Sequence, residues 1–247
     1  MPKKIAVAGA TGRVGHHVVD VLEAQGHEVV PISRTHGVDV ITGEGLADAL
    51  AGVEALVDAA TSPSPDEREA TDFFTTSSRN LQAAALNAGV QRIVVVSIIG
   101  TDRFTGGYQA AKTAHERQML LGPVPVRILR AAQFHEFVPE LMTWGRQGDV
   151  VYLPRMRTQL VAARTVAEAL AALAVEQGGN GKPIGEIAGP REESLAEAAR
   201  LLAARDGDPV RVEQMEPADD EQRLLADGTL LPGPDAVLAG PTFEEWL

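Results

Sequence analysis

Short apolar runs rich in β-branched residues alternate with longer stretches of helical periodicity from residue 5 to about residue 130. The runs predict five strands, which we place at residues 5–8, 28–32, 55–59, 93–97 and 126–130. Two of the intervening stretches predict helices that end just before Gly26 and Gly89, because glycine tolerates the positive φ found at helix C-termini. This order of elements predicts an α/β fold with a parallel sheet and helices on both of its faces.

The alternation of short apolar runs with helical stretches changes after residue 134. The remainder predicts a helix at about 139–146, a strand at 150–153 and helices near 165–176 and 194–204, and the tail from Pro217 is rich in Asp, Gly and Pro. We therefore predict a core of residues 1–134 and a smaller α/β cap region of residues 135–247 that packs on it. No linker separates the two, so one continuous domain is the alternative.

Composition narrows the class of protein. The chain has 247 residues, 45% of them hydrophobic, which is enough to bury a full core. Its formal net charge of -12 and its unclustered lysines argue against nucleic acid and anionic membranes as partners. The absence of cysteine excludes disulfides and thiolate ligands. The apolar runs at 5–8 and 93–99 are too short for a signal peptide and a membrane span, respectively, so we predict a soluble, cytoplasmic protein.

A glycine-rich loop follows the first predicted strand and opens the first predicted helix. In this context, glycines at every third position predict that backbone amides and the helix N-terminus face a common point where a pyrophosphate binds, as in Rossmann-type folds. We expect Gly9 to allow the tight turn, Gly12 the approach of the phosphate, and Gly15 the packing of helix on strand. The alternative is a turn that uses glycine for its shape alone. The cofactor-binding candidates in this loop are Gly9, Thr11, Gly12, Arg13, Val14 and Gly15.

The end of the second predicted strand indicates which dinucleotide is bound. Sites for NAD usually place an acidic residue here, which accepts hydrogen bonds from the ribose, whereas this chain has Ser33 and Arg34. A hydroxyl and a guanidinium suit a 2′-phosphate, so NADP(H) is favoured and NAD(H) is the alternative. Arg34 as an ordinary solvated side chain is the competing interpretation. Further residues predicted to line the cofactor site are Asp39, Val40, Ala59, Ala60 and Thr61.

Three residues predict a proton-transfer group. Ser97 ends the fourth predicted strand, and Tyr108 and Lys112 lie one turn apart on the helix that should follow it. A nearby ammonium lowers the pKa of a phenol, the phenol exchanges a proton with a carbonyl or carbinol oxygen, and a serine hydroxyl can bond that oxygen. Structural or surface roles for Tyr108 and Lys112 are the alternative.

Taken together, these features resemble the atypical short-chain dehydrogenase/reductase proteins, close to the NmrA-like NAD(P)-binding group. The resemblance covers nearly the whole chain and rests on the glycine loop, Asn80-Leu81, Gly89-Val90, Ser97, Tyr108 to Lys112 with Glu116, the segment from Arg130 to Phe134, and the segment from Thr242 to Leu247. It implies a Rossmann core with a small C-terminal substrate region, and NADP(H) or NAD(H) in the cleft. It also implies that Ser97, Tyr108 and Lys112 occupy the positions of the reductase triad, with Lys112 holding the nicotinamide ribose. Gln133 and Phe134 would border the nicotinamide.

The function predicted from these observations is an NADP(H)-dependent oxidoreductase that moves hydride to or from a small carbonyl, quinone or related substrate. A non-catalytic sensor of the NADP(H) redox state is the first alternative, since it needs the glycine loop and Arg34 but not Tyr108. A nucleotide-sugar epimerase or dehydratase with tightly held NAD is the second. No metal site is predicted, because the adjacent His16 and His17 should point apart and His115 has no histidine one turn away.

Overall fold

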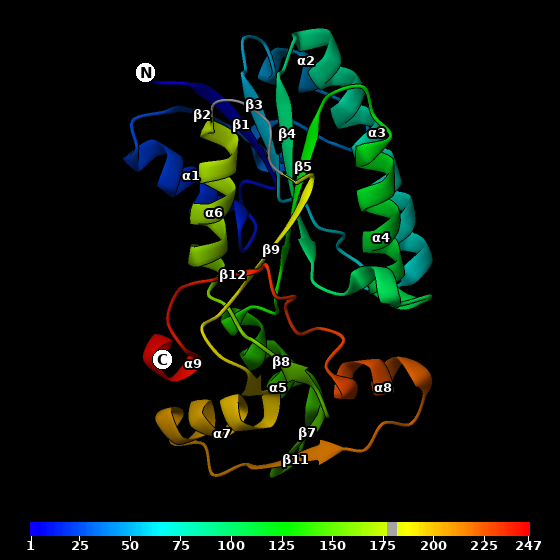
Figure 1. Ribbon diagram of the computed structural model, residues 1–247, viewed down its shortest axis with the longest axis vertical. Coiled ribbons are helices and arrows are strands. Elements are labelled where there is room, and N and C mark those ends of the chain that lie inside the picture. Colours follow the sequence, from blue (N-terminus) through cyan, green and yellow to red (C-terminus); the bar gives the residue numbers. More distant parts are fainter. Residues whose placement is uncertain (177–181) are drawn as a thin grey trace. The chain divides into compact units, whose positions relative to one another are not determined.

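The computed structural model describes residues 1–176 and 182–247 (Figure 1). Its contacts divide the chain into two compact units made of interleaved segments. Unit 1 comprises 1–97, 105–130 and 166–185, and unit 2 comprises 98–104, 131–165 and 186–247. The predicted boundary after residue 134 is kept as a proposal.

The predicted strands and helices of the first 130 residues are confirmed to within a few residues. The strands in this part are β1 (Lys4–Ala8), β2 (Glu28–Ile32), β3 (Ala55–Asp58), β4 (Arg92–Ile98) and β5 (Val126–Ala131). The helices are α1 (Gly15–Ala24), α2 (Leu46–Ala49), α3 (Glu67–Ala88) and α4 (Gly107–Leu120), with 3₁₀ turns at Arg34–His36 and Thr101–Arg103. Gly26 and Gly89 have φ of 80° and 74°, as expected for glycines that end helices.

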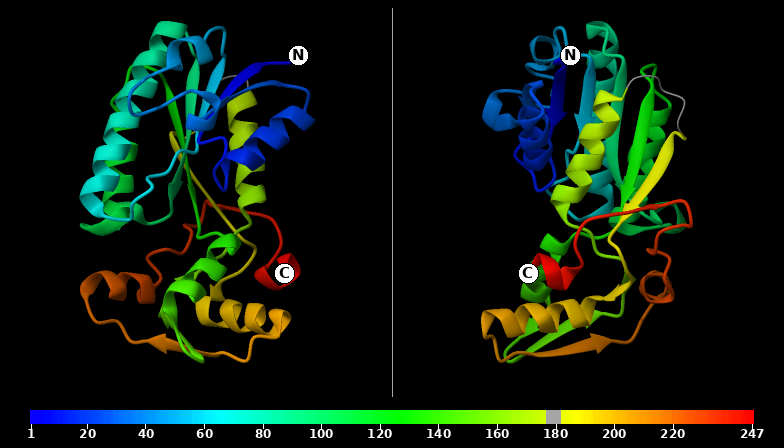
Figure 2. Two further views of the ribbon diagram at one scale, coloured as in Figure 1. Left: turned by 180° about the vertical axis from the view of Figure 1, so that it is seen from behind. Right: turned by 60° about the vertical axis from the view of Figure 1, so that its left-hand side comes forward.

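A seven-stranded parallel sheet with helices around it gives the Rossmann-type α/β fold that the sequence predicts. The strand order is β12-β9-β5-β4-β3-β1-β2, in which β9 is Ile184–Ala188 and β12 is Val237–Leu238. Helices α3 and α4 cover one face of this sheet, and α1 and α6 (Ala163–Val175) cover the other (Figures 1 and 2). The carboxyl ends of β1, β2 and β3 therefore lie next to one another, because these strands are parallel neighbours.

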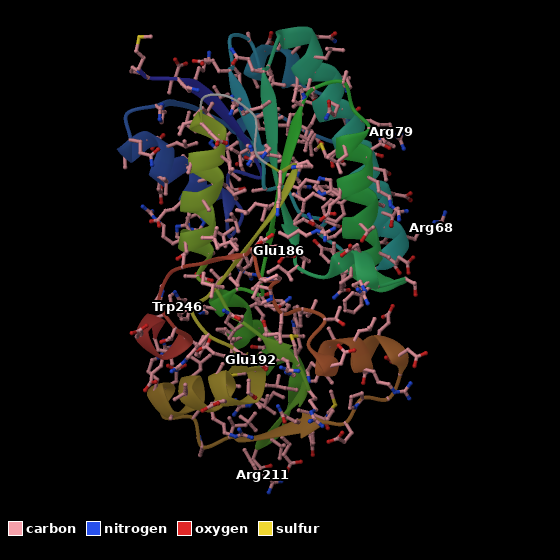
Figure 3. The ribbon with its side chains drawn as sticks, viewed as in Figure 1. Arg68, Arg79, Glu186, Glu192, Arg211 and Trp246 are labelled. Atoms are coloured by element: carbon pink, nitrogen blue, oxygen red, sulfur yellow. The ribbon has the colours of Figure 1, made fainter. Side chains whose placement is uncertain are left out.

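The core of unit 1 forms because the strands are apolar on both faces. Val57, Val94 and Ile5 are fully buried, as expected for central strands of a sheet with helices on both sides. On the α3 side, Phe74 is also fully buried and packs with Ala70 and Ala111. Figure 3 shows that Arg68 and Arg79 point outward from α3, so this helix has one buried and one solvated face.

A buried ion pair ties α4 to β5. The guanidinium of Arg130 donates two hydrogen bonds to the carboxylate of Glu116, with N to O distances of 2.9 and 2.7 Å. The two side chains are 12% and 4% exposed. Because removing one member of a buried pair leaves the other charge uncompensated, this pair matters far more to stability than a surface pair does.

We expect Glu116→Ala to lower the free energy of unfolding by about 3 kcal/mol, since the guanidinium of Arg130 would remain largely buried without its carboxylate. The matched control is Glu176→Ala. Glu176 pairs with Arg127 at 3.2 Å but is 43% exposed, so its loss should cost less than about 1 kcal/mol. Urea unfolding of both variants measures the difference, and equal losses would refute this account of the Glu116 pair.

Unit 2 contains two small sheets and several helices. Its three-stranded sheet has the order β11-β7-β6, in which the strands are β11 (Arg211–Met215), β7 (Val150–Pro154) and β6 (Arg146–Gln147). Its two-stranded sheet pairs β8 (Arg157–Thr158) with β10 (Glu193–Ser194). The helices are α5 (Val138–Gly145), α7 (Leu195–Asp206), α8 (Asp220–Asp227) and α9 (Phe243–Trp246), with a 3₁₀ turn at His135–Phe137. Apolar residues of β7, α5, α7 and α9 form its core, including Leu153, Leu202 and Phe243.

Candidate cofactor and active site

The glycine loop between β1 and α1 has room only for glycine at two positions. Gly9 has φ of 73°, and a Cβ there would lie 2.6 Å from the carbonyl oxygen of Ala59. A Cβ on Gly15 would overlap the carbonyl oxygen of Gly9, so α1 begins in direct contact with the backbone of the loop. Gly12 is more open, since its Cβ would meet only Gly9 O, at 3.2 Å. No side chain caps the N-terminus of α1, and the positive end of the helix dipole there favours an anion.

The loop forms one wall of a cavity of about 470 Å³ in unit 1. The other walls come from the end of β2, from the segment that follows it and from the segment after β3. The lining residues are Gly9, Thr11, Gly12, Ile32, Ser33, Arg34, Thr35, Val38, Asp39, Val40, Ile41, Ala59, Ala60, Thr61, Pro63 and Phe73. The cavity thus brings together most of the residues predicted to bind a cofactor. Arg13, Val14 and Gly15 lie outside this lining, and Val14 is buried.

The cavity carries an uncompensated cation at the end of β2. Arg34 is exposed, and its guanidinium makes no hydrogen bond or ion pair with any residue within 1–176 or 182–247. Next to it, Ser33 Oγ lies 2.8 Å from both Thr35 Oγ1 and His36 Nδ1. Thr35 and His36 were not singled out from the sequence, although they directly follow Arg34. Together these four side chains form a polar cluster, defined here as the Ser33–His36 cluster.

Another wall of the cavity, which includes Val40 and Ile41, is held by α3. Asn80 donates from its side-chain amide to the carbonyl oxygens of Val40 and Ile41, at 3.0 and 2.8 Å. The carboxylate of Asp39 accepts from the backbone N–H of Ile41 at 2.7 Å, which closes a local turn. The segment is therefore held by hydrogen bonds from the protein itself.

These features fit a dinucleotide phosphate. The uncapped N-terminus of α1 suits a pyrophosphate, the open Gly12 permits its close approach, and the Ser33–His36 cluster supplies a cation and hydroxyls. The end of β2 has Ile32-Ser33-Arg34 and thus no carboxylate of its own, although Asp39 lies nearby in the wall.

Tyr108 meets the cofactor cavity through Thr61. The two hydroxyl oxygens are 2.7 Å apart, and Thr61 lines the cavity. The ring of Tyr108 packs edge-on against Phe74, with centroids 5.8 Å apart. Burial raises the pKa of Tyr108, and the hydrogen bond with Thr61 opposes this only in part. The expected lowering of this pKa by Lys112 is therefore wrong for this geometry.

Lys112 is directed into the protein rather than towards Tyr108. Its Nζ donates to the carbonyl oxygen of Val96 at 3.0 Å and lies 3.0 Å from His115 Nδ1. The side chain is buried, and burial lowers the pKa of Lys112 to about 8, opposed by the charges of Asp58 and Glu116. The amine thus contacts the peptide that joins Val96 to Ser97.

Ser97 is also buried, and its hydroxyl has no hydrogen-bond partner among the described residues. The structure therefore joins Tyr108 to Thr61 and Lys112 to the peptide before Ser97, but it does not join the three side chains by hydrogen bonds. A shared catalytic role for them stays a proposal.

Two residues in contact with this group were missed from the sequence. His115 Nε2 lies 3.0 Å from the Oδ2 atom of Asp58, so His115 links Asp58 to Lys112. Asp58 ends β3, and His115 follows Lys112 by three positions on α4. Residues three apart on a helix share a face, so this spacing was the available signal.

Gln133 and Phe134 lie in unit 2. The side-chain oxygen of Gln133 accepts from Thr158 Oγ1 at 2.5 Å, and Phe134 pairs with Val161 through an isolated bridge. Their predicted place beside the nicotinamide stays a proposal. His135 is fully buried against Phe243, and burial lowers its pKa to about 4.

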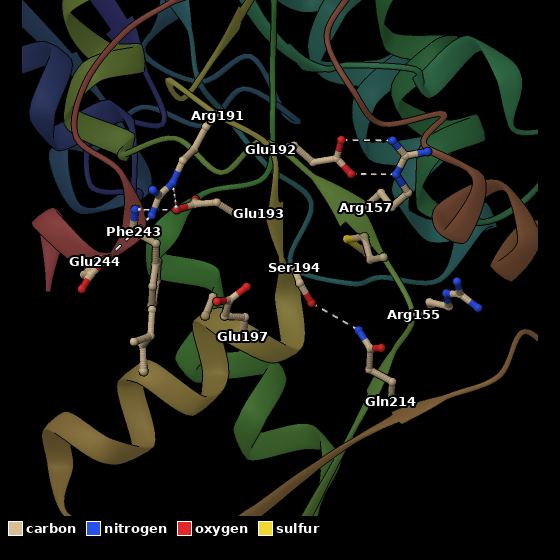
Figure 4. A pocket seen from close by; sticks show the side chains of 13 residues that line it. Arg155, Arg157, Arg191, Glu192, Glu193, Ser194, Glu197, Gln214, Phe243 and Glu244 are labelled. Carbon is tan, nitrogen blue, oxygen red and sulfur yellow. Dashed lines mark hydrogen bonds and ion pairs between the residues drawn. The ribbon is translucent and has the colours of Figure 1, made fainter.

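Unit 2 has a larger cavity of about 760 Å³, which Figure 4 shows from close by. Its charged groups are extensively paired. Arg157 donates two hydrogen bonds to Glu192, at 2.6 and 3.0 Å, and Gln214 donates to Ser194 Oγ at 3.3 Å (Figure 4). None of the residues predicted to bind a cofactor lines it. The cavity at the glycine loop is therefore the stronger cofactor site despite its smaller volume.

The comparison with protein families favours a cofactor loop over a turn that uses glycine for its shape alone. The NAD(P)H-binding family matches residues 9–121, a range that includes the glycine loop, Arg34, Thr61, Tyr108 and Lys112. Residues 9–121 are thus similar to NAD(P)H-binding domains. No curated protein sequence matches the chain.

Several solved structures share the fold of this chain. UDP-N-acetylglucosamine 4-epimerase from Bacillus cereus has a TM-score of 0.71 at 18% identity, over 98% of this chain and 93% of that one. MoeE5, solved with UDP-glucose and NAD, has a TM-score of 0.70 at 19% identity, over 98% of both chains. The NADPH-dependent quinone oxidoreductase QOR2 from Escherichia coli, solved with NADPH, has a TM-score of 0.63 at 23% identity, over 92% of this chain and 88% of that one.

The family match over residues 9–121 and the fold shared with these structures support the predicted short-chain dehydrogenase/reductase type of NAD(P)-binding protein. The narrower NmrA-like assignment stays a prediction. Within the described ranges, no helix combines the length and the apolar character that crossing a membrane requires. The same residues contain no group of three or more potential metal ligands. The expectation that His16 and His17 point apart is wrong, since their ring centroids are 3.8 Å apart.

Proposed function

We propose that the protein is an NADP(H)-dependent oxidoreductase that transfers hydride to or from a small carbonyl, quinone or related organic substrate. The observation that carries the cofactor preference is the unpaired guanidinium of Arg34 in the cavity wall, beside the hydroxyls of Ser33 and Thr35. A buried or half-buried 2′-phosphate gains charge-assisted hydrogen bonds from such a cluster, whereas a plain ribose does not need it. Thr35 and His36 would join Ser33 and Arg34 in this role.

The proposed chemistry divides between the cofactor and three side chains. Bound NADPH supplies the hydride. Tyr108 remains a protonated phenol at neutral pH because burial raises its pKa, so it is suited to donate a proton to a carbonyl oxygen during reduction. The unpartnered hydroxyl of Ser97 can bond that oxygen, and Lys112 supplies a positive charge near the peptide that precedes Ser97. The resulting alkoxide would thus be protonated as it forms.

A non-catalytic NADP(H) sensor is the second candidate, and one observation favours it. Lys112 and Ser97 are buried and are not bonded to Tyr108, as would suit residues that only support the fold. A sensor would retain cofactor affinity without turnover. A nucleotide-sugar enzyme, the class of several structures with the same fold, would instead copurify with NAD.

We expect Arg34→Ala to weaken NADPH binding about 10- to 100-fold and to leave NADH binding within about twofold, because a hydrogen bond to a charged group contributes about 1.5–3 kcal/mol. Fluorescence titration with both reduced cofactors measures the two dissociation constants. The same preparations are then tested with carbonyl and quinone substrates at the absorbance band of the reduced cofactor.

Arg79→Ala is the matched control for this titration, since Arg79 is an exposed arginine that points outward from α3 (Figure 3). It changes the net charge as Arg34→Ala does, and it should leave both affinities unchanged. Equal losses of NADPH affinity in the two variants would assign the effect to general electrostatics. Equal affinity of the wild type for NADPH and NADH would refute the proposed preference.

A further inference from the structure

A continuous chain of buried hydrogen bonds runs from the cofactor cavity to Lys112. Asp58 Oδ1 accepts from the backbone N–H of Ala60 at 3.0 Å, and Asp58 Oδ2 lies 3.0 Å from His115 Nε2. His115 Nδ1 lies 3.0 Å from Lys112 Nζ, which also donates to Val96 O at 3.0 Å. Asp58, His115 and Lys112 are 1%, 1% and 5% exposed. We call Asp58, His115 and Lys112 the relay.

The donors and acceptors of the relay admit one consistent assignment. Asp58 has two carboxylate oxygens and two neighbours, so it accepts from Ala60 N–H and from His115 Nε2–H. His115 Nδ1 is then an acceptor for Lys112, whose ammonium has three protons to donate. Burial, and secondarily the charge of Lys112, lower the pKa of His115, so a neutral imidazole between a carboxylate and an ammonium is the favoured state.

The surroundings fix the relay in place. The imidazole of His115 stacks on the ring of Phe74, with centroids 4.7 Å apart and planes 16° apart. Lys112 Nζ lies 4.6 Å from the same ring centroid, close enough for a cation–π interaction. The other charged group that acts on the relay is Glu116, whose carboxylate is bonded to Arg130. Tyr108, one turn before Lys112, bonds to Thr61 instead.

We propose that Asp58 and His115 are positioning residues that hold the amine of Lys112 on the peptide joining Val96 to Ser97 and couple it to the Ala59–Thr61 wall of the cofactor cavity. The effect of this relay on catalysis rests on the proposed function of Lys112. The positioning of the Lys112 amine by Asp58 and His115 does not depend on that function. The three side chains of the relay have matched donors and acceptors in a site from which water is largely excluded. A relay that only filled space would not require this matching.

Two substitutions, Asp58→Asn and His115→Leu, break the pairing of donors with acceptors in the relay while keeping a side chain of similar size. Asp58→Asn leaves one oxygen for two N–H donors, so one amide proton must face Ala60 N–H or His115. It also removes the negative charge that favours the ammonium form of Lys112. His115→Leu removes the acceptor for Lys112. His115→Gln keeps one donor and one acceptor, so it is the conservative variant that should rescue the relay.

The direct test is NMR titration of the lysine side chains, which number four in this sequence and include Lys4 as an internal reference. In the wild type Lys112 should titrate near its pKa of about 8. Asp58→Asn and His115→Leu should lower this midpoint by at least about one pH unit, whereas His115→Gln should stay within about half a unit of the wild type. Lys4, which pairs with Glu28 at the surface, should not move.

The proposal is overturned if Lys112 titrates alike in the wild type, Asp58→Asn and His115→Leu, or if His115→Gln shifts as far as His115→Leu. Near-ultraviolet circular dichroism identifies any variant that fails to fold, and His115→Gln against Asp58→Asn then still decides. Where turnover is found, the limb of the kcat pH profile that follows the titration of Lys112 should shift in Asp58→Asn by as much as the Lys112 midpoint. The KM for NADPH should change less than about threefold. If Lys112 titrates as expected but the protein shows no turnover, the proposed oxidoreductase function is refuted and the positioning role of Asp58 and His115 is supported.

Discussion

Tyr108→Phe should lower kcat about 10²- to 10⁴-fold and leave the dissociation constant for NADPH within about twofold, because it removes a general acid and little else. The phenylalanine ring keeps the edge-on contact with Phe74, so the packing of α4 on α3 is retained. Only the hydroxyl that meets Thr61 is lost. The measurement is steady-state turnover of the best substrate from a carbonyl and quinone panel, with NADPH affinity determined by fluorescence.

The control for this substitution is Tyr152→Phe, which changes the other of the two tyrosines in the chain. Tyr152 lies on β7 in unit 2, and its loss of a hydroxyl should leave kcat unaltered. Thr61→Val separates a positioning effect from acid catalysis, since it removes the partner of Tyr108 and retains the phenol. If Tyr108→Phe turns over as fast as the wild type, Tyr108 is not the acid and the sensor becomes the better hypothesis.

Gly15→Ala should abolish measurable NADPH binding, with a loss of at least about 100-fold, and lower the free energy of unfolding by about 1–3 kcal/mol, as overpacking of a tight site does. The added methyl group would overlap the carbonyl oxygen of Gly9, which is backbone and cannot rotate away. The glycine loop must then move, and its amides lose their common orientation towards the pyrophosphate. Cofactor titration and urea unfolding measure the two effects.

Two other glycines separate crowding from the loss of glycine itself. A Cβ on Gly185 has no neighbour within 4 Å and Gly185 lies in β9, so Gly185→Ala should be neutral or slightly stabilising. Gly12→Ala is intermediate, because its Cβ would lie 3.2 Å from Gly9 O. It should retain stability but weaken NADPH binding. Wild-type affinity in Gly15→Ala would contradict the pyrophosphate site at this loop.

The sheet of unit 1 was predictable because its signals are local. Each central strand is a short run that is apolar on both faces, and the helices after β1 and β3 each end at a glycine. Gly9, Gly26 and Gly89 all adopt the positive φ that their positions suggested. Burial of the runs and the geometry of glycine thus point to the same fold.

The elements missed from the sequence lack such runs. Strand β9 reads Ile-Gly-Glu-Ile-Ala, with only its last two residues buried, so its strand character comes from pairing with neighbours far apart in the chain. Helix α8 has no buried residue, although Asp219 caps it and Gly228 ends it. Helix α9 has four residues and a capping box formed by Thr242 and Glu245. The capping residues of both helices are visible in the sequence, but the polar composition of the C-terminal segment suggested a tail.

The cavity at the glycine loop was predictable to the extent that its lining comes from short continuous segments of the sequence. The glycine loop, Ser33-Arg34 and the segment 59–61 each follow a strand, and parallel strands bring their carboxyl ends to one edge. The direction of Lys112 could not be predicted, because it depends on an aspartate 54 positions earlier in the chain and on a ring from another helix. Helical spacing states which side chains share a face but not which of them turns inward.

The hydrogen bonds from Asn80 to the carbonyl oxygens of Val40 and Ile41 bear on how quickly a dinucleotide can bind. A loop that orders only around its ligand slows association and weakens binding, since the ligand must wait for a rare conformation. Here the peptide carbonyls are held by a side chain from α3, so we expect this wall, which is the proposed adenine end of the site, to keep its shape when a dinucleotide arrives. Association of NADPH should then be limited by diffusion and orientation, and exchange between oxidised and reduced cofactor can proceed without rebuilding the wall.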